Sequence, residues 1–250
     1  MPSYLITGAS RGLGLGFTTE LLKDKKNIVV ATARSTAGSP GLQELKAKDE
    51  NGRLVLIDLD VSKPESIRAA AEKTAQALPN GLDNLISNAG VSYNALKPFE
   101  ELDVEEFTSE LNFTVTAPLL VVREFLPLIR KSEAKRVLVV SSALGSLQNA
   151  AYLPNLANGY SVARAALNML ARKWSPILKN DQVTMAIIHP GWVSVTEIGD
   201  GITEWIKKYN PDLENLTIEQ AAANCMKVLN GLTLEDSGAF INYDGTKVPF

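Results

Sequence analysis

The chain has 250 residues, 45% of them hydrophobic, and a formal net charge of −3. This length is enough to bury a sizeable core within one domain. The charge provides no basic surface for nucleic acid or anionic lipid, so we expect a small-molecule ligand, with no nucleic acid and no membrane as partner. One cysteine, Cys225, and one histidine, His189, are too few for a disulfide framework or a zinc cluster, so no metal is expected.

The beginning of the chain, MPSYLITGAS, lacks the basic and apolar regions of a signal peptide. The sequence contains no run of about 18 consecutive apolar residues that would predict a membrane span. We therefore expect a soluble, cytoplasmic protein.

Short apolar runs rich in β-branched residues alternate with longer helical patterns along the chain. Seven runs predict strands, at residues 4–7, 27–33, 53–60, 82–90, 136–143, 183–190 and 238–245. Segments between them, such as 64–77, 105–129 and 161–178, are long enough for crossover helices. Because runs such as 137–140 are apolar on both faces, we predict a mostly parallel, doubly wound sheet of the Rossmann type, forming a single α/β domain over residues 1–250.

A glycine-rich turn, TGASRGLG, follows the first predicted strand and precedes a helical segment. Gly8, Gly12 and Gly14 permit a sharp turn and let a pyrophosphate approach the free N–H groups of the helix N-terminus. A glycine-rich turn without a ligand is the alternative. The position at the first strand-to-helix turn favours dinucleotide binding.

The turn after the second strand, ATARST, indicates which dinucleotide is bound. It has no Asp or Glu for the ribose hydroxyls of NAD, and its charged residue is Arg34. Arg11 lies inside the glycine loop, so two guanidinium groups can converge on a 2′-phosphate. The sequence therefore favours NADP(H), unless both arginines are ordinary surface charges.

These motifs resemble those of the short-chain dehydrogenase/reductase family over nearly the whole chain. They occur in the family's order: the glycine loop, the pair Asp60 and Val61, the NAG stretch at Asn88, Ala89 and Gly90, then Asn112, Ser142, Tyr160, and the PG pair Pro190 and Gly191. Within the family, RGLGLG, HPGWV and NYDGT are similar to the carbonyl reductases of the Sniffer and C-factor type.

The resemblance implies roles for particular residues. It implies that the NAG stretch stabilises the central strand. Cofactor contacts are implied for Gly8, Ser10, Arg11, Gly12, Leu13, Gly14, Arg34, Asp60, Val61, Asn88, Ala89, Gly90, Tyr160, Arg164, Pro190, Gly191, Val193 and Thr196. Catalytic roles are implied for Ser142, Tyr160, Arg164 and Asn112.

Reduction of a ketone or aldehyde needs a hydride from a nicotinamide and a proton for the oxygen that gains negative charge. The family uses a tyrosine as the acid and a serine hydroxyl to polarise the carbonyl, here Tyr160 and Ser142. Ser142 stands at the end of the fifth strand, while its neighbour Ser141 should point to the opposite side. The alternative for Ser142 is a hydroxyl that only satisfies nearby backbone groups.

Arg164 stands where the family has a lysine, four residues after Tyr160. The spacing puts both on one helix face, where a positive charge favours tyrosinate, although an ordinary exposed pair has the same spacing. The family's lysine binds the nicotinamide ribose and joins a proton relay through the asparagine, here Asn112. A guanidinium practically never gives up its proton. Three outcomes stay open: a reductase of altered efficiency, a reductase with another proton path, and a scaffold with lost or changed chemistry.

The stretch after HPGWV departs from the family pattern. Val195 stands in the slot where members commonly have a threonine that meets the nicotinamide, and Thr196 follows it. Thr196 substitutes for it after a small backbone shift, or the contact is absent. His189 is expected to pack at the strand end rather than act as a base.

Residues 195–214 should lie over the ligand crevice, as a substrate lid or as a surface excursion that covers the sheet. The segment offers apolar surface next to Trp192, from Ile198, Ile202, Trp205, Ile206 and Tyr209. Trp205, Ile206 and Tyr209 share one face of a possible helix, where core packing is the more common use. We expect an apolar carbonyl substrate, because no group of basic residues there would bind an acidic one.

The leading hypothesis is an NADPH-dependent carbonyl reductase, and the alternative is a repurposed or impaired NADP(H)-binding protein. The resemblance also implies a homodimer formed through the helices at 105–129 and 161–178. These helices must pack on the sheet as well, so a monomer can hide the same apolar surface.

Overall fold

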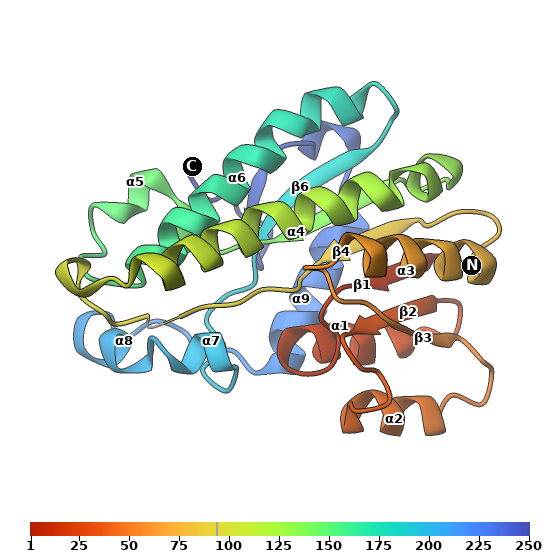
Figure 1. Ribbon diagram of the computed structural model, residues 1–250, viewed down its shortest axis with the longest axis horizontal. Helices are drawn as coiled ribbons and strands as arrows, with labels where there is room; N and C mark the ends of the chain where they lie inside the picture. The colour runs from red at the N-terminus through yellow and green to blue at the C-terminus, as the bar shows by residue number, and fades with distance from the viewer. Residues whose placement is uncertain (94) are drawn as a thin grey trace.

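The computed structural model describes residues 1–93 and 95–250, which form a sheet between two layers of helices (Figure 1). Seven parallel strands make one sheet in the order β3-β2-β1-β4-β5-β6-β7. The order runs outward from β1 in one direction and from β4 in the other. This arrangement confirms the predicted doubly wound α/β fold.

The seven predicted strands are all present. They are β1 (Ser3–Ile6), β2 (Ile28–Ala33), β3 (Leu54–Asp58), β4 (Asn84–Ser87), β5 (Arg136–Val140), β6 (Thr184–His189) and β7 (Phe240–Asn242). Several predicted runs were longer than the strands, because residues such as 88–90 and 141–143 leave the sheet at its carboxyl edge. Those residues become loops at the carboxyl ends of the strands.

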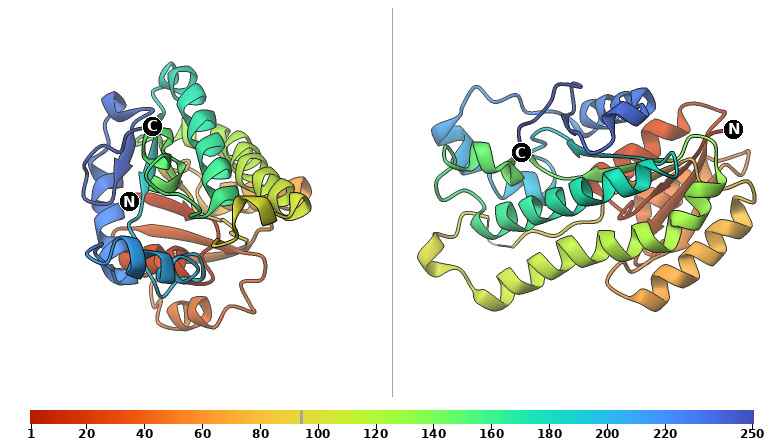
Figure 2. Two further views of the ribbon diagram at one scale, coloured as in Figure 1. Left: turned by 90° about the vertical axis from the view of Figure 1, so that its left-hand side faces the viewer. Right: turned by 90° about the horizontal axis from the view of Figure 1, so that it is seen from above.

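Helices cover both faces of the sheet (Figures 1 and 2). One face is covered by α3 (Pro64–Ala77), α4 (Val104–Lys131) and α6 (Asn158–Lys179), and the other by α1 (Gly12–Leu22), α2 (Pro40–Ala47) and α9 (Ile218–Gly231). Shorter elements are α5 (Leu147–Ala150), α7 (Glu197–Asp200), α8 (Thr203–Tyr209) and the 3₁₀ turns η1 (Phe99–Glu101), η2 (Ala143–Gly145) and η3 (Leu234–Asp236).

The helix ends follow local sequence signals. Asp103 begins α4 by accepting hydrogen bonds from the backbone N–H groups of Glu105 and Glu106. Thr217 begins α9 in a reciprocal capping box with Gln220. Proline at the first turn starts α2 and α3, where a missing N–H costs nothing.

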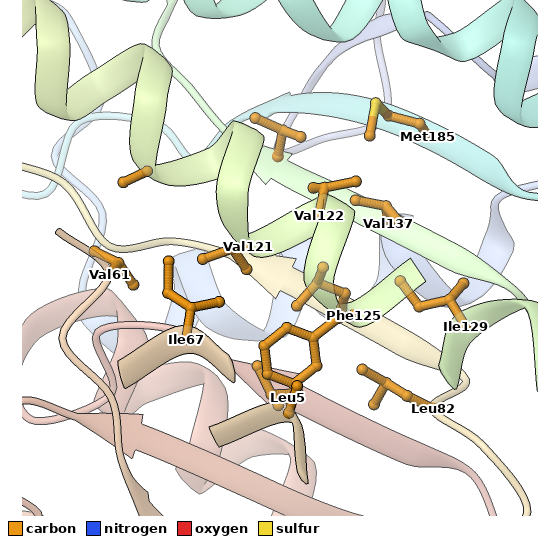
Figure 3. Packing of buried hydrophobic residues seen from close by; sticks show 14 of the residues in the cluster. Leu5, Val61, Ile67, Leu82, Val121, Val122, Phe125, Ile129, Val137 and Met185 are labelled. Atoms are coloured by element: carbon orange, nitrogen blue, oxygen red, sulfur yellow. The ribbon is translucent and has the colours of Figure 1, made fainter. Parts of the chain in front are cut away.

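The core consists of two apolar clusters, one on each face of the sheet. Leu5 of β1 belongs to the cluster under α3, α4 and α6, whereas its neighbour Ile6 belongs to the cluster under α1 and α9. Figure 3 shows the first cluster, with Phe125 of α4 packed next to Leu5. Full burial of each such side chain contributes about 1.5–3 kcal/mol.

Helix α4 has 28 residues and is long and apolar enough to cross a membrane by length and composition alone. Its inward side chains, such as Val121 and Phe125, instead pack against the sheet and the neighbouring helices. A core helix passes the same test of length and composition.

The carboxyl ends of the strands face one edge of the molecule. The glycine loop between β1 and α1, the end of β5 and the start of α6 meet at this edge. Helices α7 and α8 also lie there, beyond the strand ends, at the left of Figure 1. The fold therefore brings the predicted motifs to one edge of the sheet.

Candidate active site

The glycine loop turns sharply between β1 and α1. Gly8 and Gly12 have positive φ angles of 70° and 54°, a conformation that favours glycine. A Cβ on Gly14 would come 2.2 Å from the Gly8 carbonyl oxygen. The first residues of α1 have no side-chain cap. Their N–H groups and the positive end of the helix dipole thus form a cradle that suits a phosphate.

The NAG stretch holds this loop in place. The side-chain amide of Asn88 donates to the carbonyl oxygens of Thr7 at 2.9 Å and Gly8 at 3.3 Å. The backbone N–H groups of Asn88 and Ala89 both donate to the Thr7 hydroxyl at 3.0 Å. A Cβ on Gly8 would come 3.0 Å from the Ala89 Cα. The stretch after β4 therefore packs directly on the glycine loop.

Ser142 lies just beyond β5 and is 8% exposed. Its Oγ accepts a hydrogen bond from the Leu144 N–H at 3.2 Å, so it caps η2 and still has a hydroxyl proton to donate. The neighbouring Ser141 donates its hydroxyl to the Asn168 side chain at 2.6 Å, inside α6 packing. The side chains of the two serines therefore lie in different surroundings, as the alternation of side chains along a strand predicts.

Tyr160 and Arg164 lie in the first two turns of α6, which begins after Ala157 in a left-handed conformation (φ 50°). Both are buried, at 6% and 4% exposure. The guanidinium carbon lies 4.6 Å from the centre of the Tyr160 ring, and Nη1 donates to the Val140 carbonyl oxygen at 3.1 Å. The burial rules out an ordinary exposed pair. Arg164 instead ties α6 to the end of β5 while its charge stays beside the tyrosine.

The segment after β6 reaches back to the glycine loop. Gly191 has a positive φ of 84°, and Val193 is buried. Thr196 begins α7 by accepting the Gly199 N–H, and its methyl group would lie 3.7 Å from a Cβ on Gly12. Val195 is 74% exposed. Of the two neighbours, Thr196 is therefore the one that faces the cofactor loop.

Apolar side chains surround Tyr160 where the predicted substrate would lie. Residues from the two loops before α6 and from α7 and α8 pack into this cluster, namely Ala95, Leu144, Leu153, Leu156, Ala157, Ile198, Ile202 and Trp205. Tyr209 is 59% exposed and stacks on Trp205 at a centroid distance of 4.9 Å, while Ile206 is buried. The apolar face predicted for α8 is thus split between core and surface.

Residues 3–207 match the family model described as short chain dehydrogenase. The chain belongs to the short-chain dehydrogenase family. The short-chain dehydrogenase RED3 of Pyricularia oryzae is 34% identical over 252 residues, which cover 99% of this chain and 98% of that protein.

Solved structures of carbonyl reductases share the fold of this family member. The NADPH-bound carbonyl reductase from chicken fatty liver superposes with a TM-score of 0.86, is 32% identical, and covers 100% of this chain and 99% of its own. The carbonyl reductase Sniffer of Drosophila melanogaster has a TM-score of 0.85 over the full length of both chains. At 23% identity, Sniffer shows a likeness of fold alone.

One predicted residue of this short-chain dehydrogenase lies elsewhere. Asn112 is exposed on α4 and lines a groove with Val61 and Ser62, so the structure does not place it with Ser142 and Tyr160. An α-helix turns about 100° per residue, so a residue two positions from an inward-facing one points the opposite way. The catalytic role of Asn112 therefore has no support from an inward-facing position on α4 and stays a prediction.

The inward positions of α4 belong to Glu110 and Thr114, which sequence analysis missed. Both are buried, at 1% and 3% exposure. Burial raises the pKa of the Glu110 carboxyl to about 7, although the Arg164 charge and the Tyr93 N–H lower it. The available signal was the spacing of Glu110, Thr114 and Ala117, which share a buried face with the apolar residues that follow.

The two arginines predicted to converge on a 2′-phosphate have different surroundings in this structure. Arg34 is exposed just beyond β2, whereas Arg11 forms an exposed ion pair with Glu197 of α7. A carboxylate also enters the turn after β2 from the adjacent strand, because Asp58 accepts the Thr36 N–H and hydroxyl, both at 2.7 Å. These hydrogen bonds lower the pKa of the Asp58 carboxyl.

The remaining predicted residues have ordinary local surroundings. Asp60 accepts the Ser62 N–H at 3.1 Å and its hydroxyl at 2.6 Å, and Val61 is buried in the core. Burial lowers the pKa of the His189 imidazole to about 4, so this side chain at the end of β6 is neutral near pH 7. A neutral imidazole shielded from solvent is consistent with the expectation that His189 packs at the strand end.

Proposed function

We propose that this short-chain dehydrogenase is an NADP(H)-dependent carbonyl reductase that converts an apolar aldehyde or ketone to an alcohol. The observation that carries the proposal is the buried pair of Tyr160 and Arg164, placed beside the end of β5 and under an apolar cover. A tyrosine held next to a fixed positive charge at a ligand edge is arranged for proton transfer.

The residues present fit a dinucleotide. Positive φ angles at Gly8 and Gly12 and the uncapped start of α1 form the phosphate cradle. Arg34 is exposed beyond β2, where it can reach a 2′-phosphate, and Thr196 borders the loop from the other side. The NADPH of the chicken carbonyl reductase structure supports the choice of NADP(H). When bound, this cofactor supplies or accepts the hydride.

Three side chains are proposed to handle the carbonyl oxygen and its proton. The Ser142 hydroxyl donates a hydrogen bond to the substrate oxygen as negative charge develops on it. Tyr160 gives that oxygen its proton. Arg164 keeps a permanent positive charge against the tyrosine ring and, because a guanidinium practically never gives up its proton, acts by charge and position rather than as a relay.

The substrate class follows from the cover over Tyr160. Ile198, Ile202 and Trp205 present apolar surface from α7 and α8. We propose that residues 195–214 act as a lid, held near the glycine loop by the Arg11–Glu197 ion pair. The lid would exclude water from the reacting carbonyl.

A homodimer in the cytoplasm is part of the proposal. Apolar side chains on the outer surface of α6 support it, because Val162, Met169 and Ile177 are 51%, 57% and 64% exposed. Size-exclusion chromatography with light scattering gives the mass directly. A chain of 27.0 kDa that elutes as a monomer would contradict the dimer.

The alternative is an NADP(H)-binding protein whose chemistry is impaired or repurposed. Two features support it: by the family resemblance, Arg164 stands where members have lysine, and Asn112 is exposed on α4. Both changes affect the proton relay that the family resemblance implies.

Turnover and binding must be measured separately to decide between them. We expect NADPH oxidation with some member of a panel of apolar aldehydes, ketones and diketones, and a loss of about 100-fold or more in Tyr160→Phe. Tyr152→Phe is the matched control, because Tyr152 is 79% exposed and should leave the rate unchanged. Tight NADPH binding with no turnover across the panel would support the alternative.

A further inference from the structure

Glu110 is a buried carboxylic acid next to the proposed reaction site. It lies on the inward face of α4, is 1% exposed, and its Oε1 has no hydrogen-bond partner among the described residues. Thr114, one turn further along α4, is likewise buried with an unpartnered hydroxyl. Burial of a carboxylate is costly unless a positive charge or hydrogen bonds compensate it.

The start of α6 is shaped to admit this carboxylate. Helices α4 and α6 pack against each other, and a Cβ on Gly159 would come 3.3 Å from Glu110 Oε2. Such a distance is tighter than an ordinary contact, so the absent side chain leaves room for the acid. Glu110 therefore faces the residue directly before Tyr160.

Arg164 is fixed on several sides. Its Nη1 donates to the Val140 carbonyl oxygen, its guanidinium lies over the Tyr160 ring, and its Nη2 would lie 2.7 Å from a Cβ on Gly90. Its Nε is shielded from solvent and has no hydrogen-bond partner in the described part of the chain. The guanidinium has little freedom to turn toward solvent, so its charge stays beside the Tyr160 ring.

The charges that face Glu110 come from two helices and one loop. Arg164 of α6 provides the attraction, the Tyr93 backbone N–H adds a hydrogen bond, and Glu106, one turn earlier on α4, adds repulsion. Among the described residues, no Glu110–Arg164 ion pair within 4.0 Å is present, so the two groups interact through space at longer range. The buried surroundings screen this interaction less than water would.

We propose that Glu110 is a positioning residue whose carboxylate sets the net charge that Arg164 presents to Tyr160. This inference deepens the proposed function and rests on it, since it concerns how the acid of that reaction is held protonated. Glu110 touches neither substrate nor cofactor in this account and acts through Arg164.

The direction of the effect follows from simple electrostatics. An ionised Glu110 offsets part of the guanidinium charge, so the Tyr160 phenol keeps its proton more readily for donation. A neutral Glu110 leaves the full positive charge beside the ring and favours tyrosinate. Burial raises the pKa of Glu110 to about 7, which puts the change between the two states near neutral pH.

A spectroscopic titration tests the inference without any need for turnover. The ultraviolet absorbance of tyrosinate is followed against pH, and the same variant carrying Tyr160→Phe is subtracted, because the chain has six tyrosines. Glu110→Gln should shift this tyrosinate difference curve to lower pH than in the intact protein. Glu105→Gln removes an equal charge from an exposed position on α4 and should leave the curve unchanged.

The pH profile of reduction provides the second readout. In Glu110→Gln, kcat should begin to fall at lower pH than in the intact protein, with an unchanged KM for NADPH, and Glu110→Asp should restore part of the profile. A kcat lowered by the same factor at every pH would show a merely structural role and overturn the inference.

The two hypotheses fail in different ways. An intact protein that binds NADPH but reduces no carbonyl contradicts the proposed function, while the titration still reports on Glu110. A Tyr160 titration that is the same in the intact protein and in Glu110→Gln overturns the role of Glu110, whatever the activity.

Discussion

The proposed cofactor side and the proposed catalytic side of the site are built in different ways. The cofactor side is made by backbone: a glycine loop on one continuous stretch, held by the amide of Asn88. The proposed catalytic side is made by side chains, with Tyr160 and Arg164 on α6 and Ser142 after β5, and Glu110 of α4 lies behind them. A backbone site depends on a fixed local sequence. In a site made by side chains, one residue can be replaced by another when the residues around it change as well.

The largest effect should come from a change on the cofactor side. Gly14→Ala puts a Cβ 2.2 Å from the Gly8 carbonyl oxygen, so the backbone must move. We expect a loss of about 2 kcal/mol in the free energy of unfolding and NADPH binding weaker by about 100-fold, measured by denaturation and fluorescence titration.

Gly231→Ala is the control for this substitution, because a Cβ at Gly231 meets nothing within 4 Å. It should leave the NADPH affinity unchanged and should not lower the free energy of unfolding, because alanine suits a helix better than glycine. Unaltered NADPH affinity in Gly14→Ala would show that the glycine loop does not make the phosphate cradle.

Arg34→Asp tests the choice between the two dinucleotides on the same side of the site. Arg34 is exposed beyond β2, and Asp58 already brings one carboxylate to that turn. A second carboxylate should repel a 2′-phosphate and bind ribose hydroxyls, so the ratio of NADPH to NADH affinity should fall by about 10- to 100-fold. Arg68→Asp, on the exposed face of α3, should leave the ratio as it is. A retained preference for NADPH would refute the assignment of Arg34.

Arg164→Lys tests whether the catalytic side is built around a guanidinium. A lysine cannot reproduce both the hydrogen bond to Val140 and the stacking on Tyr160, so the rate of reduction should fall by about 10-fold. The same replacement at Arg172, further along α6, is the control. A faster Arg164→Lys enzyme would mean that the arginine is a handicap for the relay.

The smallest effect concerns stability and Glu110. The carboxyl has a raised pKa in the folded protein, about 7 against an ordinary 4.5, so folding favours its protonated form. Its contribution is therefore fully present below pH 4.5 and is lost as pH rises through about 7. Glu110→Gln removes this dependence and should exceed the intact protein in free energy of unfolding by on the order of 1 kcal/mol above pH 7.

Denaturant unfolding at acidic and at mildly alkaline pH measures this difference. Glu105→Gln should track the intact protein at both values, because Glu105 is exposed. If the difference in free energy of unfolding between Glu110→Gln and the intact protein were the same at both pH values, Glu110 would not be a buried group that binds a proton on folding.

The sequence predicted those parts of the molecule that depend on local patterns. All seven strands and the crossover helix at 64–77 follow from apolar runs and turn residues. The glycine loop could be placed because its function depends on backbone conformation at Gly8 and Gly12. The pairing of Tyr160 with Arg164 could be proposed from their spacing, although only the structure shows that both are buried.

Other parts depend on contacts between distant segments. The inward face of α4 could not be chosen from the family order, which favoured Asn112 over Glu110 and Thr114, and the helical phase decided otherwise. The ion pair between Arg11 and Glu197 joins residues far apart in the chain. A single sequence does not show which distant residues come close in space, so these contacts could not be predicted from it.

Hydride transfer itself is the most direct test of the central claim. NADPH labelled with deuterium at the transferring position of its nicotinamide is incubated with the intact protein and an apolar aldehyde or diketone, and the product is examined by mass spectrometry. The account predicts an alcohol that carries deuterium on its carbinol carbon, and at least about 100-fold less of it with Tyr160→Phe. Bound NADPH that never passes its label to any carbonyl of the panel, or equal labelling with Tyr160→Phe, would contradict the assignment of Tyr160 as the acid of a carbonyl reductase.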